Sequence, residues 1–539
     1  MSAQSSGPRE NPVPLFVEAK RPFGDFRYRS GHVPGQYTLL ETVGGGVAMI
    51  DFDADGYLDL FFAGGGSIDG AKFKISGRPA ELFRNELGSR FSSMSQGARL
   101  DSSSLYSHGA TVLDYDQDGW PDLLLTGLGG QLLFQNLGDG TFIDRTEAAG
   151  LATGGWSTSA VAADLDSDGD VDIYVGRYCL WSLAEDQRQN CGDLVRGIRD
   201  SCPPQKFMAA PDLLLLSDGQ GGFQDASEKL NPTGAERALG VLATDVNADG
   251  FVDVYVANDA GPNHLYLGSE NPSWRNTGLI AGISGNEFGL PEGSMGIAVA
   301  DFNGDQLVDL FVTNFELENN SLYENVGGGN FRHATLSSGL SVRGSTLIGF
   351  GTSFGDFDAD GWEDLVVLNG SVFYHTGQSP YAQPALLFKN VHGKFVDASS
   401  AGGSFFDRAH VGRGLATGDL NNDGATDIIA LDQEEPPTWL MGNYQPTAWL
   451  RVQLRRTQGC NPPIGARVQM QSAGIIQSRW VSAGTGYLSY GDERLLFPLN
   501  SSLPSPQVVV TWPNGRSERF ENLTVNQPIT LIEGQGVRP

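Results

Sequence analysis

Short apolar runs, each bounded by glycine, asparagine or aspartate, recur along most of the chain. The stretch from residue 296 to residue 335 is typical, because GIAVAD, VDLFVTN, SLYEN and NFRHAT follow one another there with turn residues between them. Each run has the length of a strand, and none shows the 3.6-residue period of an amphipathic helix. The pattern therefore predicts an all-β chain whose strands are joined by turns.

A nine-residue acidic pattern separates the first and second runs of each unit. It occurs seven times, at intervals of 50 to 81 residues, and a glycine stands five residues before it in six of the seven units. The first aspartates are Asp51, Asp114, Asp164, Asp245, Asp301, Asp356 and Asp419. Four strands in each of seven units predict a seven-bladed β-propeller. A coil of other β repeats is the weaker alternative.

The acidic pattern, D-x-[DN]-x-D-G-x-x-D, has the chemistry of a cation site. Side chains at positions 1, 3, 5 and 9 converge, position 7 offers its carbonyl, and the glycine at position 6 allows a sharp turn. An all-oxygen ligand set suits Ca2+ better than Mg2+ or Zn2+. A solvated acidic turn is the alternative for one loop, but it explains seven loops in register poorly.

The sequence therefore predicts up to seven Ca2+ ions that stabilise the fold. The predicted ligands are Asp51, Asp53, Asp55, Tyr57 and Asp59; Asp114, Asp116, Asp118, Trp120 and Asp122; Asp164, Asp166, Asp168, Asp170 and Asp172; Asp245, Asn247, Asp249, Phe251 and Asp253; Asp301, Asn303, Asp305, Leu307 and Asp309; Asp356, Asp358, Asp360, Trp362 and Asp364; Asp419, Asn421, Asp423, Ala425 and Asp427. The site at Asp301 is the least certain, since Gln306 stands where the turn glycine is expected.

Composition narrows the class of partner. The 539 residues include 64 Asp and Glu against 35 Lys and Arg, a net charge of -29, and 72 glycines. This charge argues against a nucleic-acid partner and against docking on anionic lipid. No apolar run is long enough for a membrane span, and no signal peptide is visible. The expected location is extracytoplasmic, periplasmic or secreted, if a leader was removed, and cytoplasmic otherwise.

The two ends of the chain complete the predicted organisation. The seventh unit lacks a fourth strand, and PLFVEA around Phe16 resembles it, so we expect the N-terminus to close the last blade. After the last acidic repeat, strand-like runs such as WLRVQL and VVVTW follow. The predicted parts are an N-terminal segment (1–35), a propeller (36–443) and a small β-sandwich-like domain (444–539).

Basic residues gather in the C-terminal part. They are Arg451, Arg455, Arg456, Arg467 and Arg479. Docking against the acidic propeller is the favoured interpretation, and binding of an acidic ligand is the alternative.

These residues resemble a known family. Units such as GVAMIDFDADGYLDLFFAG are similar to the FG-GAP/VCBS repeat of integrin-α-like propellers. The stretches AWLRVQL, IGARVQM, GTGYLSYGDERLLFPL and VVVTWPNGRSERF are similar to the ASPIC/UnbV domain of the cartilage acidic protein-like family. The resemblance implies a calcium-binding propeller with a β-rich C-terminal domain, usually exported. The chain departs from it at LLFPLN, where relatives tend to have a glycine-bearing FGL-type end.

The resemblance also implies a disulfide in the longest interval between repeats. Related proteins often carry a Cys…Cys-Pro insertion there, so Cys191 and Cys202 are expected to pair; two free thiols are the alternative. A pairing of Cys179 with Cys460 is left open.

Residues that precede the glycine-led strand should ring one mouth of the propeller channel. They could form a small-molecule pocket, although they could equally be ordinary polar loop residues. The candidates are Glu41, His108, Trp156, Arg237, Glu292, Phe350, His410 and Arg413. The GxSxG pattern at residues 351–355 does not indicate a hydrolase, because it runs into an acidic loop and not into a helix.

Two functions follow from these observations. The first is a binding or scaffold module for a protein or glycan partner. The alternative is a calcium-dependent enzyme of secondary-metabolite biosynthesis that cyclises or tailors a small-molecule substrate at the channel mouth. The sequence leaves the choice between enzyme and binding module open.

Overall fold

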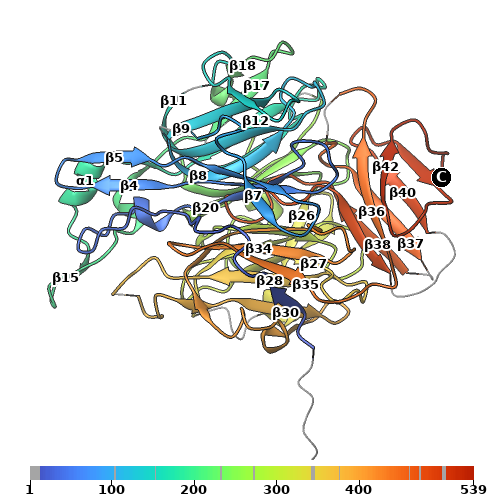
Figure 1. Ribbon diagram of the computed structural model, residues 1–539. Coiled ribbons are helices and arrows are strands. Elements are labelled where there is room, and N and C mark those ends of the chain that lie inside the picture. Colours follow the sequence, from blue (N-terminus) through green and yellow to red (C-terminus); the bar gives the residue numbers. More distant parts are fainter. Residues whose placement is uncertain are drawn as a thin grey trace, which may run out of the picture.

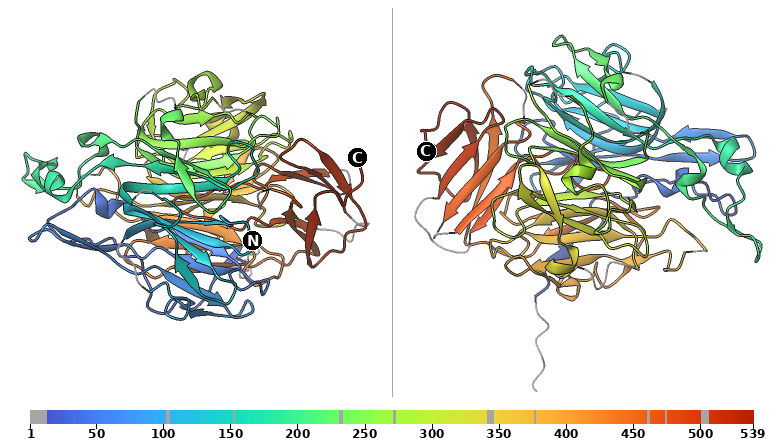
Figure 2. Two further views of the ribbon diagram at one scale, coloured as in Figure 1. Left: turned by 90° about the horizontal axis from the view of Figure 1, so that it is seen from above. Right: turned by 180° about the vertical axis from the view of Figure 1, so that it is seen from behind.

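The computed structural model describes residues 13–101, 105–151, 153–230, 234–270, 273–340, 346–375, 377–459, 462–472, 475–499 and 506–539. Figure 1 shows a large body of radiating sheets with a smaller β domain packed on one face. Figure 2 shows the same two parts from above and from behind. Among the described helices, none is long and apolar enough to cross a membrane.

The first strands of the seven units line the centre of the body. They are β2 (Val47–Ile50), β8 (Tyr106–Leu113), β11 (Thr153–Ala163), β19 (Ala238–Thr244), β23 (Ile297–Ala300), β27 (Gly349–Gly355) and β33 (Gly412–Gly418). Each contacts the next in chain order, and β33 contacts β2, so these strands form a closed ring. The all-β propeller class is therefore confirmed.

Outer strands complete each unit by antiparallel pairing. The second strands are β3 (Asp59–Phe62), β9 (Asp122–Asn136), β12 (Asp172–Arg177), β20 (Asp253–Gly261), β24 (Asp309–Val312), β28 (Asp364–Asn369) and β34 (Asp427–Asp432). The third are β6 (Glu81–Asn85), β17 (Leu213–Ser217), β21 (His264–Tyr266), β25 (Ser321–Gly327), β30 (Leu386–Asn390) and β35 (Thr438–Gly442). The fourth are β7 (Phe91–Ser93), β10 (Phe142–Asp144), β18 (Phe223–Asp225), β26 (Asn330–His333), β31 (Phe395–Asp397) and β1 (Phe16–Glu18).

Two units depart from the predicted four separate strands. In the second unit one long strand, β9, serves as both second and third strand, and it also pairs with β11 of the next unit. In the fourth unit the described residues give β21 no strand partner on its outer side, only a bridge between Tyr266 and Asn276. This is the unit in which the sequence lacks an aromatic-led closing run.

Hairpins and short helices decorate the ring. The hairpins are β4 (Gly66–Asp69) with β5 (Lys74–Gly77), β13 (Cys179–Leu180) with β16 (Met208–Ala209), β14 (Gly192–Asp193) with β15 (Ile198–Arg199), and β29 (Gln383–Pro384) with β32 (Ala409–His410). The fourth unit adds β22 (Glu292–Gly293), which pairs with β20. The α-helices are α1 (Leu183–Arg188), α2 (Gly278–Ala281) and α3 (Thr335–Ser338).

The repeated glycine before each acidic loop allows the first strands to approach one another. A Cβ on Gly296 would lie 2.1 Å from the carbonyl oxygen of Phe350 in the next unit. A Cβ on Gly414 would lie 2.0 Å from the carbonyl oxygen of Gly45, where the ring closes. Any larger residue at these positions would push neighbouring strands apart.

The C-terminal part is a small sandwich of two sheets. One sheet has the order β39 (Leu495–Leu499), β36 (Ala448–Arg455), β42 (Pro528–Ile532), and the other the order β38 (Ile475–Trp480), β37 (Arg467–Ser472), β40 (Gln507–Thr511), β41 (Ser517–Phe520). Side chains of both sheets, such as Leu450 and Val468, are buried in one shared core. The β-sandwich-like architecture is confirmed.

The loop between β38 and β39 enters the propeller channel. Backbone hydrogen bonds join Ala483 to Ala243 in β19, Gly486 to Ile297 in β23 and Tyr490 to β2. Tyr487 is fully buried, and its ring packs edge-on against Phe350 of β27 at 5.0 Å. The segment 482–492 therefore plugs the centre of the ring. Most of it belongs to the stretch GTGYLSYGDERLLFPL, from which only the family resemblance was inferred.

The N-terminus closes the last unit as predicted. Strand β1 pairs with β35, with Phe16 opposite Gly442. Phe16 is 3% exposed and its ring lies 5.3 Å from Phe357 and 6.1 Å from Phe406.

Replacing Phe16 by alanine should therefore weaken the packing of strand β1 on the last unit. We expect Phe16→Ala to lower the free energy of unfolding by about 3–5 kcal/mol, because it empties a buried aromatic site. Val17 on the same strand is 41% exposed, so Val17→Ala is the matched control and should cost less than about 1 kcal/mol. Denaturant unfolding followed by tryptophan fluorescence measures both; equal losses would contradict this role of Phe16.

Candidate calcium centres

Each acidic loop joins a first strand to a second strand and turns through two left-handed residues. In the first loop these are Ala54 (φ 57°) at position 4 and Gly56 (φ 88°) at position 6. The sequence pattern anticipates the glycine at position 6 and misses position 4. The loop at Asp301 has the glycine at position 4, Gly304 (φ 77°), and Gln306 (φ 71°) at position 6. Its backbone therefore has the same form as the others.

The first aspartate holds the turn in shape. In the first loop the backbone N–H groups of Asp55 and Gly56 donate to the Asp51 carboxylate at 3.0 and 3.1 Å. The N–H of Tyr57 donates to Asp55 at 3.0 Å. Equivalent bonds to the first aspartate occur at Asp356 and Asp419. The loop is thus ordered by its own backbone, with its carboxylates drawn inward.

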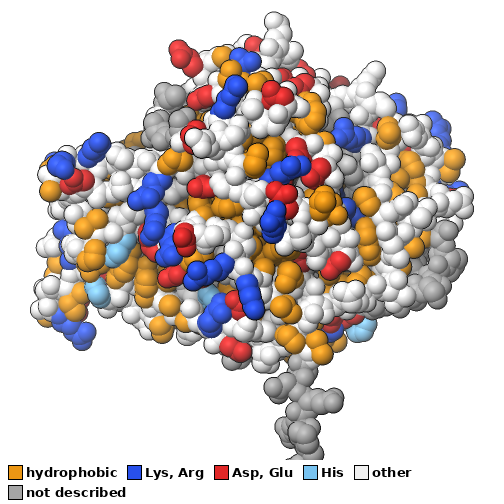
Figure 3. Space-filling view, in the orientation of Figure 1, with side chains coloured by type: hydrophobic (Ala, Val, Ile, Leu, Met, Phe, Trp, Pro, Cys, Tyr) orange, Lys and Arg blue, Asp and Glu red, His pale blue; other side chains and the backbone are white. Residues whose placement is uncertain are grey.

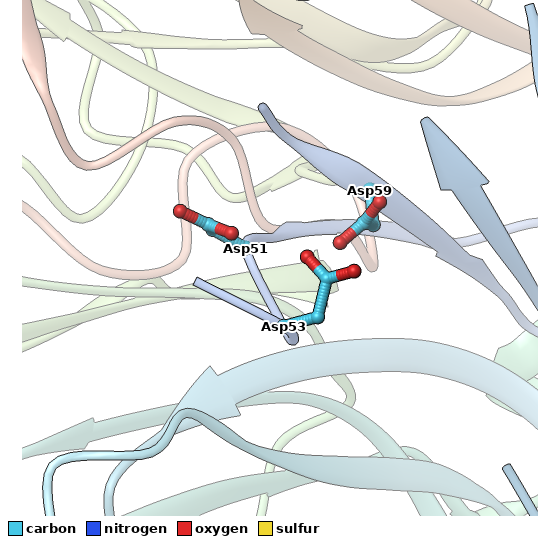
Figure 4. A group of neighbouring side chains, drawn as sticks. All are labelled: Asp51, Asp53 and Asp59. Atoms are coloured by element: carbon cyan, nitrogen blue, oxygen red, sulfur yellow. The ribbon is translucent and has the colours of Figure 1, made fainter. Parts of the chain in front are cut away.

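Carboxylates converge in five of the loops within the described chain. In each, three carboxylate oxygens from different residues lie within 4.8 Å of one another. Figure 4 shows the side chains of the first group side by side. The groups are Asp51, Asp53 and Asp59; Asp114, Asp116 and Asp122; Asp164, Asp166 and Asp172; Asp301, Asp305 and Asp309; Asp356, Asp358 and Asp360. The loops at Asp245 and Asp419 have asparagine at position 3, as does the loop at Asp301, but their three carboxylates are not among these groups.

Several of these oxygens are buried and accept no hydrogen bond from the described residues. They are Oδ1 of Asp53, Asp114, Asp116, Asp164, Asp166, Asp301 and Asp358. A buried acceptor without a donor is costly, and a buried carboxylate more so, unless a cation lies beside it. Hard oxygen ligands at this spacing fit Ca2+.

The ninth residue of each loop has a second task that the sequence pattern does not show. The Asp122 carboxylate is fully buried and accepts the N–H of Tyr115 at 3.0 Å and that of Asn136 at 2.7 Å. The same pair of bonds is made by Asp59, Asp172, Asp253, Asp309, Asp364 and Asp427. These aspartates tie the loop to the third strand, whether or not they also contact an ion.

An asparagine extends this tie to the neighbouring unit. The Asn136 amide donates to the carbonyl of Pro121 in its own loop and to that of Phe52 in the preceding unit, at 3.2 and 2.9 Å. Asn85, Asn325 and Asn390 do the same. The signal was present in the sequence, since ELFRN, LLFQN, SLYEN and LLFKN all end in asparagine.

Burial makes the loop carboxylates hard to ionise without a partner. Burial, together with the neighbouring carboxylates, raises the pKa of Asp59 and Asp309 to about 9 and that of Asp122 to about 8. A divalent cation would favour the ionised form.

The C-terminal sandwich covers the face on which the acidic loops lie. Arg451 Nη1 lies 3.3 Å from Asp419, and Arg479 Nε lies 3.7 Å from Glu363. Arg467 donates to the carbonyl of Gln306 at 3.2 Å. The predicted docking of the basic tail on the acidic propeller is confirmed for these three arginines.

Gln306, predicted to weaken its site, also belongs to this contact. The Gln469 amide donates to its side-chain oxygen at 2.9 Å. The departure from glycine therefore gives the C-terminal domain a polar contact.

The predicted mouth residues are mostly buried and do not face one open pocket. Arg413 is fully buried, donates to the carbonyl of Thr42 at 3.0 Å and stacks on Phe350 at 3.9 Å. His108 and Trp156 are fully buried and stack on each other at 5.8 Å.

The remaining four mouth residues bind separate neighbours. Glu41 pairs with His32, Arg237 donates to backbone carbonyls of residues 204 and 207, Glu292 accepts from Asn314 and Ser321, and His410 pairs with Asp432. A ligand role for these eight residues stays a prediction.

Cys179, Cys191 and Cys202 lie in the insertion between β12 and β17. Cys191 and Cys202 form a disulfide, as the resemblance implies. Cys179 is buried, and Cys460 lies outside the described residues. Residues 351–355, the GxSxG pattern, lie in β27 and lead directly into the loop at Asp356, as expected.

Fold and loops together define the class: a β-propeller with acidic loops, capped and plugged by its own C-terminal domain. The chain combines FG-GAP-like repeats, matched at residues 51–125, 114–175, 245–312 and 301–367, with an ASPIC and UnbV domain at residues 457–538.

The curated relatives carry one name. Cartilage acidic protein 1 of Mus musculus is 23% identical over 500 residues, which cover 87% of this chain and 70% of that protein. The match to cartilage acidic protein 1 of Homo sapiens is 27% identical over 191 residues, 34% of this chain and 27% of that protein. The human match thus spans about a quarter of the relative's length.

Solved structures resemble the chain more loosely. An Agrocybe aegerita lectin that recognises terminal N-acetylglucosamine aligns with a TM-score of 0.40 and 15% identity, over 74% of this chain and 95% of its own. The BP39L lectin of Burkholderia pseudomallei aligns with a TM-score of 0.38 and 11% identity, over 75% and 97%.

The two roles of loop aspartates can be separated in the second loop. Asp122→Ala leaves two buried N–H groups without an acceptor, so we expect it to lower the free energy of unfolding by about 2–5 kcal/mol even in chelator. Asp118 is exposed and accepts only the N–H of Trp120, so Asp118→Ala should cost less than about 1 kcal/mol in chelator. Circular dichroism during guanidinium unfolding measures the free energy of unfolding of both variants. Equal losses of stability would refute the structural role of position 9.

The docking contact can be tested at the buried pair of Arg451 and Asp419. Their side chains are 1% and 0% exposed, so Arg451→Met should destabilise the protein by about 3–5 kcal/mol because it strands a buried carboxylate. Arg516→Met, at an exposed turn of the same domain, is the control. Limited proteolysis between residues 443 and 448 should speed up only in the first variant; unchanged cleavage there would contradict the docking role.

Proposed function

We propose that this protein is an exported, calcium-stabilised β-propeller that serves as a binding or scaffold module for a protein or glycan partner. Its parts are the N-terminal segment (1–35), the propeller (36–443) and the ASPIC/UnbV domain (444–539). The ions are structural: they hold together loops that the ring and the C-terminal domain both depend on.

The convergent carboxylates carry the calcium proposal. In five loops, three carboxylate oxygens lie within 4.8 Å of one another. Some of the loop oxygens, such as Asp114 Oδ1, are buried and accept no hydrogen bond from the described residues, as is expected of a cation site without its ion. Binding free energy at such loops becomes folding free energy, because separated carboxylates repel less in the unfolded chain.

Export is supported by the disulfide. Cys191 and Cys202 close a loop of the hairpin β14–β15, and such bonds persist in oxidising compartments.

A binding role is supported by exposed apolar tips far from the C-terminal domain. Val195 at the tip of β14–β15 is 99% exposed, and Phe73 at the tip of β4–β5 is 60% exposed. Figure 3 shows hydrophobic and basic side chains mixed at this end of an otherwise acidic protein. Contiguous exposed apolar surface marks interaction sites, and we propose that these tips belong to one.

Calcium should raise the stability of the whole molecule. We expect chelation to lower the melting temperature, since each ion present at 100 times its Kd contributes about 2.7 kcal/mol. Readdition of Ca2+ should restore it, whereas Mg2+ at the same concentration should not, because it demands a tighter octahedral shell. Identical melting curves with and without chelator would refute the proposal; differential scanning calorimetry gives the measurement.

A further inference from the structure

Three acidic loops contain a positively charged side chain supplied by the protein itself. Arg84 Nε lies 2.7 Å from Asp53 Oδ2, and its Nη2 lies 3.3 Å from Asp55 Oδ2. Lys389 Nζ lies 2.9 Å from Asp360 and contacts Asp358 as well. In a third loop Arg451 pairs with Asp419. An ion entering these loops meets a positive charge already in place.

The C-terminal domain covers most of the turns. A Cβ at position 6 would meet its atoms within 4 Å at Gly169, Gly250, Gly361 and Gly424. Gln306 is bonded to it directly, and Arg494 donates to the carbonyl of Gly56 at 3.3 Å. A Cβ on Gly119, in the loop at Asp114, would meet none of the described atoms within 4 Å, and the same holds for Gly56 in the loop at Asp51.

Among the described residues, only the loop at Asp114 combines an uncovered turn with carboxylates that pair with no lysine or arginine. Its turn is open, and its carboxylates have a neutral partner, the Gln135 amide, which donates to Asp116 at 2.5 Å. Oδ1 of Asp114 and Oδ1 of Asp116 are buried without any donor in the described chain. A cation held here by Asp114, Asp116 and Asp122 would keep a side turned toward solvent.

That open side faces a cleft of about 480 Å³ between the propeller and the C-terminal domain. Apolar side chains, among them Trp120, Leu454 and Ile529, line part of it. Arg455 lies on its wall, where it interacts electrostatically with Glu493 but forms no close ion pair with the described residues. Arg451, whose side chain is only 1% exposed, also lines the cleft, and its Nε has no acceptor in the described chain.

We propose that this cleft binds a ligand with a carboxylate on an apolar body, the carboxylate meeting the ion of the loop at Asp114 and Arg455. The proposal rests on the calcium function proposed above. Calcium accepts six to eight oxygen ligands, more than one loop supplies, and prefers anionic ones. Arginine pairs with carboxylates, and a cavity of this volume that combines apolar walls with charged groups is suited to a ligand with both characters. The charged residues of the wall are Asp51, Asp114, Asp492, Glu493, Arg451, Arg455 and Arg494.

Tryptophans at position 7 make the loops distinguishable by terbium luminescence. Trp120 belongs to the loop at Asp114, and Trp362 to the loop at Asp356, which holds Lys389 and lies under Gln477. Terbium seeks oxygen ligands as calcium does, and a nearby tryptophan sensitises its emission. The signal lost on Trp120→Phe therefore reports the ion in the loop at Asp114, and the signal lost on Trp362→Phe reports the ion in the loop at Asp356. Decay rates in H2O and D2O count the water molecules on each ion.

The probes are hexanoate, acetate and hexanol, added to the terbium-loaded full-length protein. Hexanoate should displace water from the Trp120-reported ion, acetate should need at least about tenfold higher concentration because it lacks the apolar body, and hexanol should displace none. The water count at the Trp362-reported ion should not change. Arg455→Gln should raise the half-saturating hexanoate concentration about tenfold, and Arg516→Gln should leave it unchanged.

The outcomes separate the two proposals. If no loop binds terbium and calcium displaces none, the calcium function fails. If terbium binds but Trp120→Phe loses no signal, or hexanoate leaves the water count unchanged or acts no better than hexanol, the cleft proposal fails while the calcium function stands.

Discussion

Repulsion between carboxylates is the interaction on which the rest of this structure depends. Each acidic turn gathers three or more of them between a first and a second strand, and two such charges about 4 Å apart repel by about 4 kcal/mol at an effective dielectric of 20. The fold reduces this repulsion in three ways. Backbone N–H groups bind positions 1 and 9, and arginine or lysine enters the loops near Asp53, Asp358 and Asp419. The third way is the cation that we propose for the buried oxygens that accept no hydrogen bond from the described residues.

The same negative charge explains where the C-terminal domain docks. Its arginines approach the acidic face, and its segment 482–492 reaches through that face into the channel, where it bonds to strands of several units. The plug needs the ring to be closed, and β1 closes the ring by pairing with β35. Loops, plug and N-terminal strand therefore depend on one another, and we expect the two parts of the chain to unfold together.

The sequence was sufficient for features that repeat and insufficient for those that occur once. The all-β class, the acidic loops and the closing strand at Phe16 followed from period and spacing. The sequence alone could not show whether Asp122 accepts backbone N–H groups or binds an ion, because either role requires a buried carboxylate at this position. The left-handed residue at position 4 was missed, since Ala54 and Asn422 carry no glycine signal.

The plug could not be predicted, because its contacts join residues about 190 to 440 positions apart and no periodic pattern encodes them. For that reason the mouth residues were expected to face an open channel. The structure instead buries Arg413 and Phe350 against neighbours, with Tyr487 of the plug on the Phe350 ring.

The plug also changes where a ligand can be sought. In many propellers the channel is the natural concave site, but here segment 482–492 occupies its centre and hydrogen-bonds to the strands that line it. The hollow of suitable size and mixed chemistry lies between the domains, beside the acidic loop that the C-terminal domain leaves uncovered. The domain that fills the channel therefore also forms one wall of this cleft. Its arginines pair with the acidic face of the propeller at Arg451 and Arg479, and Arg455 lines the cleft that we propose as a ligand site.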